Sequence, residues 1–444
     1  MSSRRFDVLV VGAGPAGSVA ALVLARAGAR VALVDKARFP RDKACGDFIG
    51  PRGLQVLADL DVCEPDGLDV GDMIVVGPTG RQVVLPCVPG LSYPGRARAV
   101  TRMVFDDALR TAAIDAGATE VEGRADRPLW SSSHLDGFVV EGRELRADFV
   151  IGADGATSHV AASTGLVEGS RVLWGFAVRC YLDQRVDLPA ITLWEPTRWR
   201  AFPGYGWVFP GPGGVANIGL GLGTLADRRP GAGAVRLLPA YLDHLVGLGL
   251  LDRAPGSLPP RLGGWLKMGM VGTTAASGRT LLVGDAAGLV NPLQGEGIAQ
   301  AMTSGRAAAE AVLDGAGSAG AHYMGHLARS HLPYQRVAAA GHAALVARPW
   351  AIATAGRVLT APLLGPAMAG GWGIFWNELL EGAAPGGAQR LARASTVLGR
   401  AITAGSGVSR WFTVTFDSRR ANGGVNRAEL AARLPAYLEG TEGP

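Results

Sequence analysis

Three glycines near the start of the chain have the spacing that a bound dinucleotide requires. They lie in Gly12-Ala-Gly14-Pro-Ala16-Gly17, and Asp35 follows farther on. Gly12 permits a tight turn, Gly14 lets a diphosphate approach the backbone, and Gly17 allows a helix to pack closely on a strand. The helix N-terminus offers free N–H groups to the phosphates, and an acid such as Asp35 can accept hydrogen bonds from ribose hydroxyls. The pattern indicates a dinucleotide site.

Two later aspartates indicate which dinucleotide is bound. Asp154 and Asp285 each follow a short apolar run that is typical of a buried strand. The segment 280–310 resembles the flavin-closing motif of the glutathione-reductase-like FAD superfamily, in which an aspartate at the position of Asp285 contacts the ribityl chain. A helix beginning near Gly297 would point its N-terminus at the flavin pyrimidine, where reduced flavin is negatively charged. These features favour FAD over NAD, with ordinary helix capping as the alternative role for Asp285.

The elements that must position these residues can be recognised from hydrophobic patterning. Residues 6–35 read as strand, helix and strand, which predicts parallel strands joined by a right-handed crossover. Helices are expected over 101–116 and 297–313, and strands over 149–154 and 279–285. Between 171 and 223 aromatic and polar residues alternate, which is typical of an antiparallel sheet.

We therefore predict an α/β fold, in which a Rossmann-like FAD-binding domain is interleaved with an antiparallel-sheet substrate domain. The FAD-binding domain is assigned to 1–72, 99–170 and 275–317, and the substrate domain to 73–98 and 171–274. A C-terminal helical, apolar region is assigned to 318–444.

The composition argues against several other classes of protein. Lys and Arg exceed Asp and Glu by five but are spread along the chain, so no nucleic-acid surface is expected. The four cysteines lack zinc spacing and the histidines form no metal motif, so no metal is expected and a reducing cytoplasm is predicted. The stretch 358–377 has no charged residue but contains two prolines and four glycines. It predicts reversible, peripheral membrane contact or a wall around an apolar substrate, not a membrane span.

Two further motifs narrow the family. One is Phe39-Pro-Arg-Asp-Lys-Ala-Cys45-Gly46, and the other is Tyr205-Gly-Trp207-Val-Phe209-Pro. Together with Gly295-Glu-Gly297-Ile298 they resemble the geranylgeranyl reductase family over about residues 6–315. Flavin-dependent halogenases carry a related W-x-W-x-I-P motif that this chain does not match, and aromatic hydroxylases usually lack the Cys-Gly pair. The chain departs from its relatives at Ala161, where they often have an arginine. This difference concerns how the loop after Asp154 would contact NAD(P)H.

The resemblance implies a set of site residues. Cys45 is placed near the flavin ring as a candidate catalytic thiol, with a small buried packing residue as the alternative. The aromatic residues expected to form a substrate wall, unless they fill the sheet core, are Trp174, Phe176, Trp194, Tyr205, Trp207 and Phe209. The residues expected to bind the cofactor are Gly12, Gly14, Ala16, Gly17, Asp35, Lys36, Cys45, Gly46, Arg102, Ala125, Asp154, Asp285, Gly297 and Ile298.

The expected function is that of an FAD-dependent oxidoreductase. The resemblance implies reduction of carbon–carbon double bonds in an apolar, isoprenoid small molecule, with NAD(P)H or another donor supplying electrons transiently. A monooxygenase acting on a polyketide or terpenoid in secondary metabolism remains an alternative, because it would share most of these motifs. A redox-neutral cyclase with a structural FAD is a third possibility.

Overall fold

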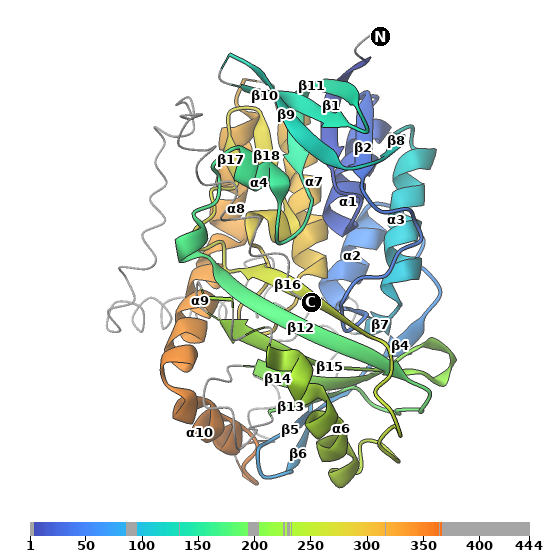
Figure 1. The fold of residues 1–444 in the computed structure, drawn as a ribbon, viewed down its shortest axis with the longest axis vertical. Helices are drawn as coiled ribbons and strands as arrows, with labels where there is room; N and C mark the ends of the chain where they lie inside the picture. Colours follow the sequence, from blue (N-terminus) through green and yellow to red (C-terminus); the bar gives the residue numbers. More distant parts are fainter. Residues whose placement is uncertain are drawn as a thin grey trace.

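Strand β1 (Arg4–Val11) occupies the middle of a mainly parallel sheet (Figure 1). The structure, a computed structural model, describes residues 4–85, 96–132, 134–193, 204–224, 227–228, 231, 233–315, 317–363 and 365. β1 pairs in parallel with β2 (Val31–Asp35) and with β11 (Arg143–Gly152). The sheet continues in parallel from β2 to β8 (Thr119–Glu122) and from β11 to β18 (Thr280–Leu282), and β17 (Ala276–Ser277) adds an antiparallel edge. The strands of this nucleotide-binding sheet thus come from three separate stretches of the chain.

Helix α1 (Pro15–Arg26) packs between α3 (Arg102–Asp115) and α7 (Ile298–Asp314). The α1–α7 contact is very close, because a Cβ at Gly305 would lie 2.1 Å from the Ala16 carbonyl oxygen. β11 also pairs with β10 (His134–Val140), which pairs with β9 (Ala125–Ser131), and the short α4 (His159–Ser163) packs against β9 and β11. The sequence patterning did not reveal this antiparallel extension.

The second sheet has seven strands and lies below the first in Figure 1. Its order is β16 (Arg261–Met268), β12 (Leu173–Leu182), β15 (Ala216–Thr224), β14 (Gly204–Pro210), β13 (Ala190–Thr192), β5 (Met73–Val76) and β6 (Gln82–Leu85). Neighbouring strands are antiparallel except β13 and β5. Helix α6 (Leu238–Gly247) covers one face, where Tyr241 and Thr192 share a hydrogen bond of 2.8 Å between their hydroxyls. The opposite face is turned toward the first sheet.

A small third sheet bridges the other two. It consists of β3 (Phe48–Ile49), β7 (Ala97–Ala99) and β4 (Leu68–Val70), and α2 (Pro51–Asp59) follows β3 directly. The strand β3 begins two residues after Gly46, so this sheet holds the Cys45-Gly46 motif near the junction of the two large sheets.

The predicted fold class is confirmed, because a parallel nucleotide-binding sheet, a separate antiparallel sheet and C-terminal helices are all present. The helices after residue 318 are α8 (Ala319–Ser330), α9 (Leu332–Ala347) and α10 (Pro349–Leu359). One grouping differs from the sequence assignment. α8 packs against α7 and β17, and its buried Tyr323 donates a hydrogen bond of 2.7 Å to the Leu282 carbonyl oxygen. α8 therefore belongs physically with the nucleotide-binding sheet.

None of the helices in the part of the chain that the structure describes combines the length and the apolar character needed to cross a bilayer. Most of the uncharged stretch 358–377 lies outside the described residues.

Candidate active site

The glycine loop between β1 and α1 contains two glycines that the fold requires and one that faces open space. Gly12 has φ +106°, and a Cβ there would lie 2.3 Å from the Ala153 carbonyl oxygen. A Cβ on Gly17 would lie 1.8 Å from the Gly12 carbonyl oxygen. At Gly14, by contrast, the nearest atom to a Cβ would be a side-chain nitrogen of Arg41 at 3.5 Å. The fold requires glycine at positions 12 and 17, whereas Gly14 keeps a space open beside the helix N-terminus.

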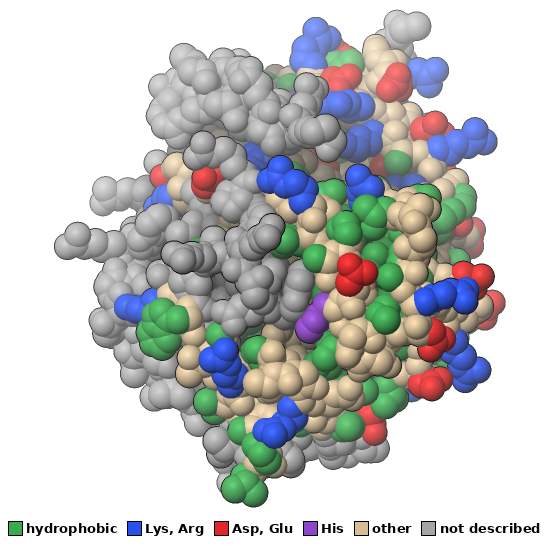
Figure 2. Space-filling model, turned by 60° about the horizontal axis from the view of Figure 1, so that its bottom comes forward, with side chains coloured by type: hydrophobic (Ala, Val, Ile, Leu, Met, Phe, Trp, Pro, Cys, Tyr) green, Lys and Arg blue, Asp and Glu red, His purple; other side chains and the backbone are tan. Residues whose placement is uncertain are grey.

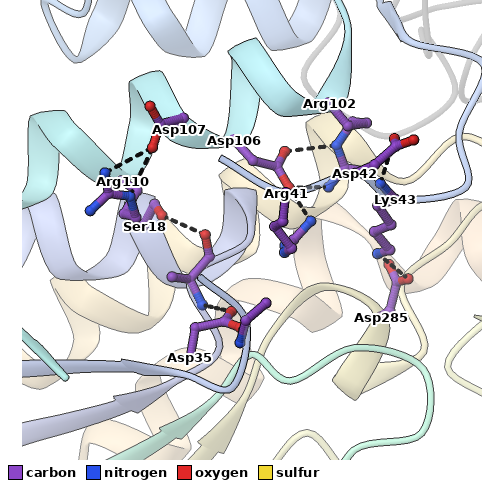
Figure 3. Close-up of polar contacts among 12 residues, drawn as sticks. Ser18, Asp35, Arg41, Asp42, Lys43, Arg102, Asp106, Asp107, Arg110 and Asp285 are labelled. Carbon is purple, nitrogen blue, oxygen red and sulfur yellow. Dashed lines mark hydrogen bonds and ion pairs between the residues drawn. The ribbon is translucent and has the colours of Figure 1, made fainter. Parts of the chain in front are cut away.

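The surroundings of this open space suit the diphosphate of FAD. No side chain caps the N-terminus of α1, so its first-turn N–H groups remain available to a ligand. Arg41 lies next to Gly14 and also pairs with Asp106 at 2.9 Å. The Asp35 carboxylate is fixed at the end of β2, where it accepts hydrogen bonds from the Ala13 and Ala37 N–H groups at 2.7 and 2.8 Å. Figure 3 shows these groups on neighbouring elements.

Arg102 forms the buried base of this charged region. It donates two hydrogen bonds of 2.7 Å to the fully buried Asp106, one turn along α3. Burial by itself would lower the pKa of Arg102, but the charge and the hydrogen bonds of Asp106 raise it above its ordinary value. Arg102 is therefore a permanent cation at the wall of the site.

A cavity of about 1300 Å³, its open mouth included, lies between the two large sheets. Segments far apart in the sequence meet there, including the loop that carries Cys45, strand β14 and the N-terminus of α7. The cavity is lined by nine of the residues predicted from the sequence, namely Cys45, Gly46, Arg102, Tyr205, Trp207, Phe209, Asp285, Gly297 and Ile298.

The aromatic residues of β14 form one wall of the cavity. Their ring centroids are separated by 6.2 Å between Tyr205 and Trp207 and by 6.3 Å between Trp207 and Phe209. Tyr205 donates a hydrogen bond to the Gln294 carbonyl oxygen, and burial raises the pKa of its hydroxyl. A Cβ on Gly46 would lie 2.9 Å from the Phe209 ring. The Cys-Gly motif thus needs glycine at its second position because the loop lies directly against this wall.

The N-terminus of α7 closes one end of the cavity. Its N-cap residue Gly297 has no side-chain cap, and a Cβ there would lie 3.5 Å from a carboxylate oxygen of Asp285. Lys43 reaches from the Cys45 loop to Asp285, with 3.4 Å between the ammonium nitrogen and the carboxylate oxygen (Figure 3). This end combines uncapped helix N–H groups with an acid, as the contacts of a flavin and its ribityl chain require.

Other predicted residues lie elsewhere. Trp174 and Phe176 are not among the cavity-lining residues, because alternate side chains of a strand point to opposite faces and those of β12 that face the cavity are Gly175 and Ala177. Trp174 is fully buried and packs edge-on to Trp265, with Phe176 on its other side. The expectation that these two line the pocket is therefore corrected to packing on the opposite face. Trp194 lies outside the described residues.

The remaining predicted contacts surround the nucleotide end of the first sheet. Asp154 accepts hydrogen bonds from the Ser158 hydroxyl and from the His159 and Val160 N–H groups, so its carboxylate caps α4. Lys36 is exposed just after β2, and Ala125 is buried at the start of β9. Ala16 is buried against Gly284 and Gly305. The structure gives these residues positions near the glycine loop, and their contact with a cofactor stays a prediction.

Sequence reasoning missed the floor of the cavity and two buried polar groups. The floor is formed by small residues, namely Gly175, Ala177, Gly221 and Gly223, and Leu266 and Met268 border it. The alternation of small residues along β12 and β15 could have revealed this surface. Asp47 and Lys267 are buried polar residues whose positions became apparent only once the sheets were packed.

The comparisons with known proteins agree with this geometry. Residues 5–178 match the FAD binding domain family. The menaquinone reductase of Mycolicibacterium smegmatis is 38% identical over 331 residues, which cover 70% of this chain and 78% of the relative. The chain belongs to the geranylgeranyl reductase family of FAD-dependent oxidoreductases. A further member, digeranylgeranylglycerophospholipid reductase 2 of Methanopyrus kandleri, is 34% identical over 314 residues, with 69% of this chain and 76% of the relative covered.

A solved structure shows the same fold. The geranylgeranyl bacteriochlorophyll reductase-like protein of Thermoplasma acidophilum has a TM-score of 0.63 at 20% identity, and the match covers 92% of this chain and 100% of the other. The protein is thus an FAD-binding enzyme, and the cradle at Gly14 fits the cofactor of its family.

The two kinds of glycine in the loop predict different defects. Gly14→Val should give a folded protein that is colourless, because its side chain enters the diphosphate space without displacing protein atoms. Gly17→Val should lose the fold itself, since its Cβ overlaps the Gly12 carbonyl oxygen. Circular dichroism, thermal melting and the flavin absorbance of the purified proteins would separate the two effects. A yellow Gly14→Val protein with full FAD content would contradict the assignment of the cradle.

The buried Lys267 should give the protein an unusual dependence of its free energy of unfolding on pH. It is fully buried, its ammonium has no hydrogen-bond partner among the described residues, and burial lowers its pKa from 10.5 to about 8 despite the nearby Asp154 and Asp285. Because only the unfolded chain binds this proton between those values, the free energy of unfolding falls as the pH drops from 10.5 to 8 and is then constant. Lys267→Met should therefore raise the free energy of unfolding at pH 7 by up to about 3 kcal/mol.

Chemical denaturation at several pH values would test this. The gain should shrink as the pH rises toward 10.5, and Lys36→Met, at an exposed lysine, should show no such pH-dependent gain. An equal effect of Lys267→Met at pH 7 and pH 10 would indicate altered packing instead.

Proposed function

We propose that the protein reduces carbon–carbon double bonds of an apolar, isoprenoid substrate. The observation that carries the proposal is the cavity itself, in which an aromatic wall and a floor of small residues extend from Cys45 and the α7 N-terminus. An apolar chain would match these surfaces. The names of the relatives, which include menaquinone reductase and digeranylgeranylglycerophospholipid reductase, support this substrate class.

Different residues of the chain would have different roles in such a reaction. When bound, reduced FAD supplies the hydride that is added to one alkene carbon. The glycine loop and Arg41 hold the diphosphate, and the α7 N-terminus stabilises negative charge at the ring end of the site. Tyr205, Trp207 and Phe209 hold the alkene and exclude water.

Cys45 is the proposed proton donor to the second alkene carbon. It lines the cavity, and burial raises the pKa of its thiol, which therefore keeps its proton near neutral pH. The loss of the π bond, the hydride and the proton together give a product with two more hydrogen atoms. The thiolate that remains regains its proton from solvent through the open mouth of the cavity.

The electron donor is proposed to be NAD(P)H or another reductant. Ala161, at the position where relatives often have an arginine, is fully buried in α4. An arginine there would have to displace core atoms, so any NAD(P)H contact in this protein must use other residues.

Turnover without oxygen is the decisive test of reduction. Enzyme reduced with dithionite under strict anaerobic conditions should convert a geranylgeranyl substrate to a product heavier by two hydrogen atoms, as measured by mass spectrometry. Dithionite with free FAD in place of the enzyme is the control. A requirement for oxygen, with a product heavier by one oxygen atom, would instead establish the monooxygenase alternative.

We also propose that α10 touches a membrane surface from which a lipid substrate enters. Its outer face carries Trp350 and Val358, which are 67% and 44% exposed, and Leu363 just beyond it is 87% exposed. Arg348 and Arg357 are exposed beside them, and the helix contains no acidic residue. On the face shown in Figure 2, hydrophobic side chains lie among Lys and Arg at the lower left, while most of the acidic side chains lie toward the right. An apolar face with basic neighbours suits an anionic lipid surface.

The double change Trp350→Glu, Leu363→Glu should abolish this contact. The wild-type protein should sediment with phosphatidylglycerol-containing vesicles and be released by carbonate, whereas the variant should stay in solution with its FAD retained. Leu313→Glu, at an exposed leucine near the end of α7, is the matched control and should behave like the wild type. Equal vesicle binding by the double variant would assign the contact to another surface.

A further inference from the structure

Asp47 is a buried acid that the reaction described above does not use. It follows the Cys45-Gly46 pair directly, is 4% exposed and has φ +58°, a backbone conformation that is uncommon for residues other than glycine. One carboxylate oxygen accepts hydrogen bonds from the Asn217 amide, at 2.9 Å, and from the Tyr181 hydroxyl. The other has no hydrogen-bond partner in the described part of the chain. A buried acid with one oxygen unsatisfied needs a reason to be retained.

Asn217 connects this acid with the candidate catalytic loop. Its amide nitrogen donates to the Asp47 carboxylate and also to the Cys45 carbonyl oxygen, each at 2.9 Å. Its amide oxygen accepts a hydrogen bond of 2.9 Å from the Trp207 indole. Asn217 therefore joins the Cys45 loop to the aromatic wall through three hydrogen bonds, all of them buried or partly buried. Both N–H groups of its amide nitrogen are therefore bonded to the loop that carries Cys45 and Asp47.

The Cys45 thiol lies between groups of opposite charge. Burial and the negative charge of Asp47 raise the pKa of this thiol and favour its protonated form. Arg102, which contacts the sulfur, and the hydrogen bond from the Asp47 N–H act in the opposite direction. Arg179 lies over the Tyr181 ring at 4.1 Å, pairs with Asp42 and adds a positive charge on the side of β12. Burial raises the pKa of Asp47 itself, although the Tyr181 and Asn217 hydrogen bonds and the two arginines oppose the rise.

We propose that Asp47 and Asn217 are a positioning pair for Cys45, which fixes the thiol against the aromatic wall and keeps it protonated until the substrate takes the proton. Asn217 fixes the position of Cys45 by its hydrogen bond to the Cys45 carbonyl oxygen. The negative charge of Asp47 counteracts the effect of Arg102, which favours the thiolate. The catalytic meaning of this pair rests on the proposed function, but its effect on the thiol can be measured without any turnover.

Asp47→Asn removes the charge while conserving the shape and one acceptor oxygen, which can still accept the hydrogen bonds of Asn217 and Tyr181. In FAD-loaded protein, the rate of Cys45 alkylation by iodoacetamide would be followed against pH by peptide mass spectrometry, which separates Cys45 from the other cysteines. The midpoint should move to lower pH by about one pH unit, because the charge that opposes the thiolate is gone. Asp42→Asn, an acid of the same loop that pairs with Arg179, should leave the midpoint unchanged. An unchanged midpoint in Asp47→Asn would overturn the assignment of Asp47.

Asn217→Ala tests the position, and it also serves if Asp47→Asn fails to retain FAD. With geranylgeranyl substrate under anaerobic conditions, kcat should fall by roughly tenfold while KM stays nearly constant. In a Cys45→Ser background the same change should have little further effect, because Asn217 acts through Cys45. An equal loss of kcat in both backgrounds would overturn the positioning role. A shifted alkylation midpoint without any alkene reduction would uphold the pair and refute the proposed function instead.

Discussion

Direct backbone contact between α1 and α7 holds the two ends of the cofactor site together. Ala16 in α1 is touched by Gly284 and Gly305, which lie almost 300 residues later in the chain. Any side chain at Gly305 would meet the Ala16 carbonyl oxygen, so the helices can approach only because these residues are small. This contact brings the glycine loop of the first 35 residues next to Asp285 and Gly297. Without it, the first turn of α1, whose Pro15 lines the cavity, would not lie beside the ring end of the site.

The second sheet provides the cavity through the alternation of its strands. On β12 the residues that face the cavity are Gly175 and Ala177, while Trp174 and Phe176 pack on the other side. On β14 the register places Tyr205, Trp207 and Phe209 on the cavity face. A shift of one residue in β12 would exchange the open floor for bulky rings, and the same shift in β14 would turn the aromatic wall away from the cavity. The space for a substrate thus depends on register as much as on composition.

Buried charge is concentrated where the sheets meet. Arg102 and Asp106 neutralise each other inside the nucleotide-binding half, and Asp47 is held by Tyr181 and Asn217 at the edge of the other half. Lys267 remains without a hydrogen-bond partner among the described residues. Such groups cost stability, and isolated buried charges are rare in proteins unless function retains them. Arg102 lines the cavity, so its positive charge is in place before a substrate arrives.

The amino-acid sequence by itself determined the nucleotide-binding half, because its signals are local. Gly12, Gly14 and Gly17 act within one turn, and the apolar runs of β1, β2 and β11 specify buried parallel strands without reference to the rest of the chain. The motifs around Cys45 and Trp207 likewise identified the family. Only the tertiary structure decided which face of β12 meets the cavity, that α8 packs on α7, and that Asp47, Asn217 and Cys45 are neighbours. The face of β12 depends on strand register, the place of α8 depends on how consecutive helices pack, and the Asn217–Asp47 contact joins residues 170 positions apart, so no local pattern encodes these outcomes.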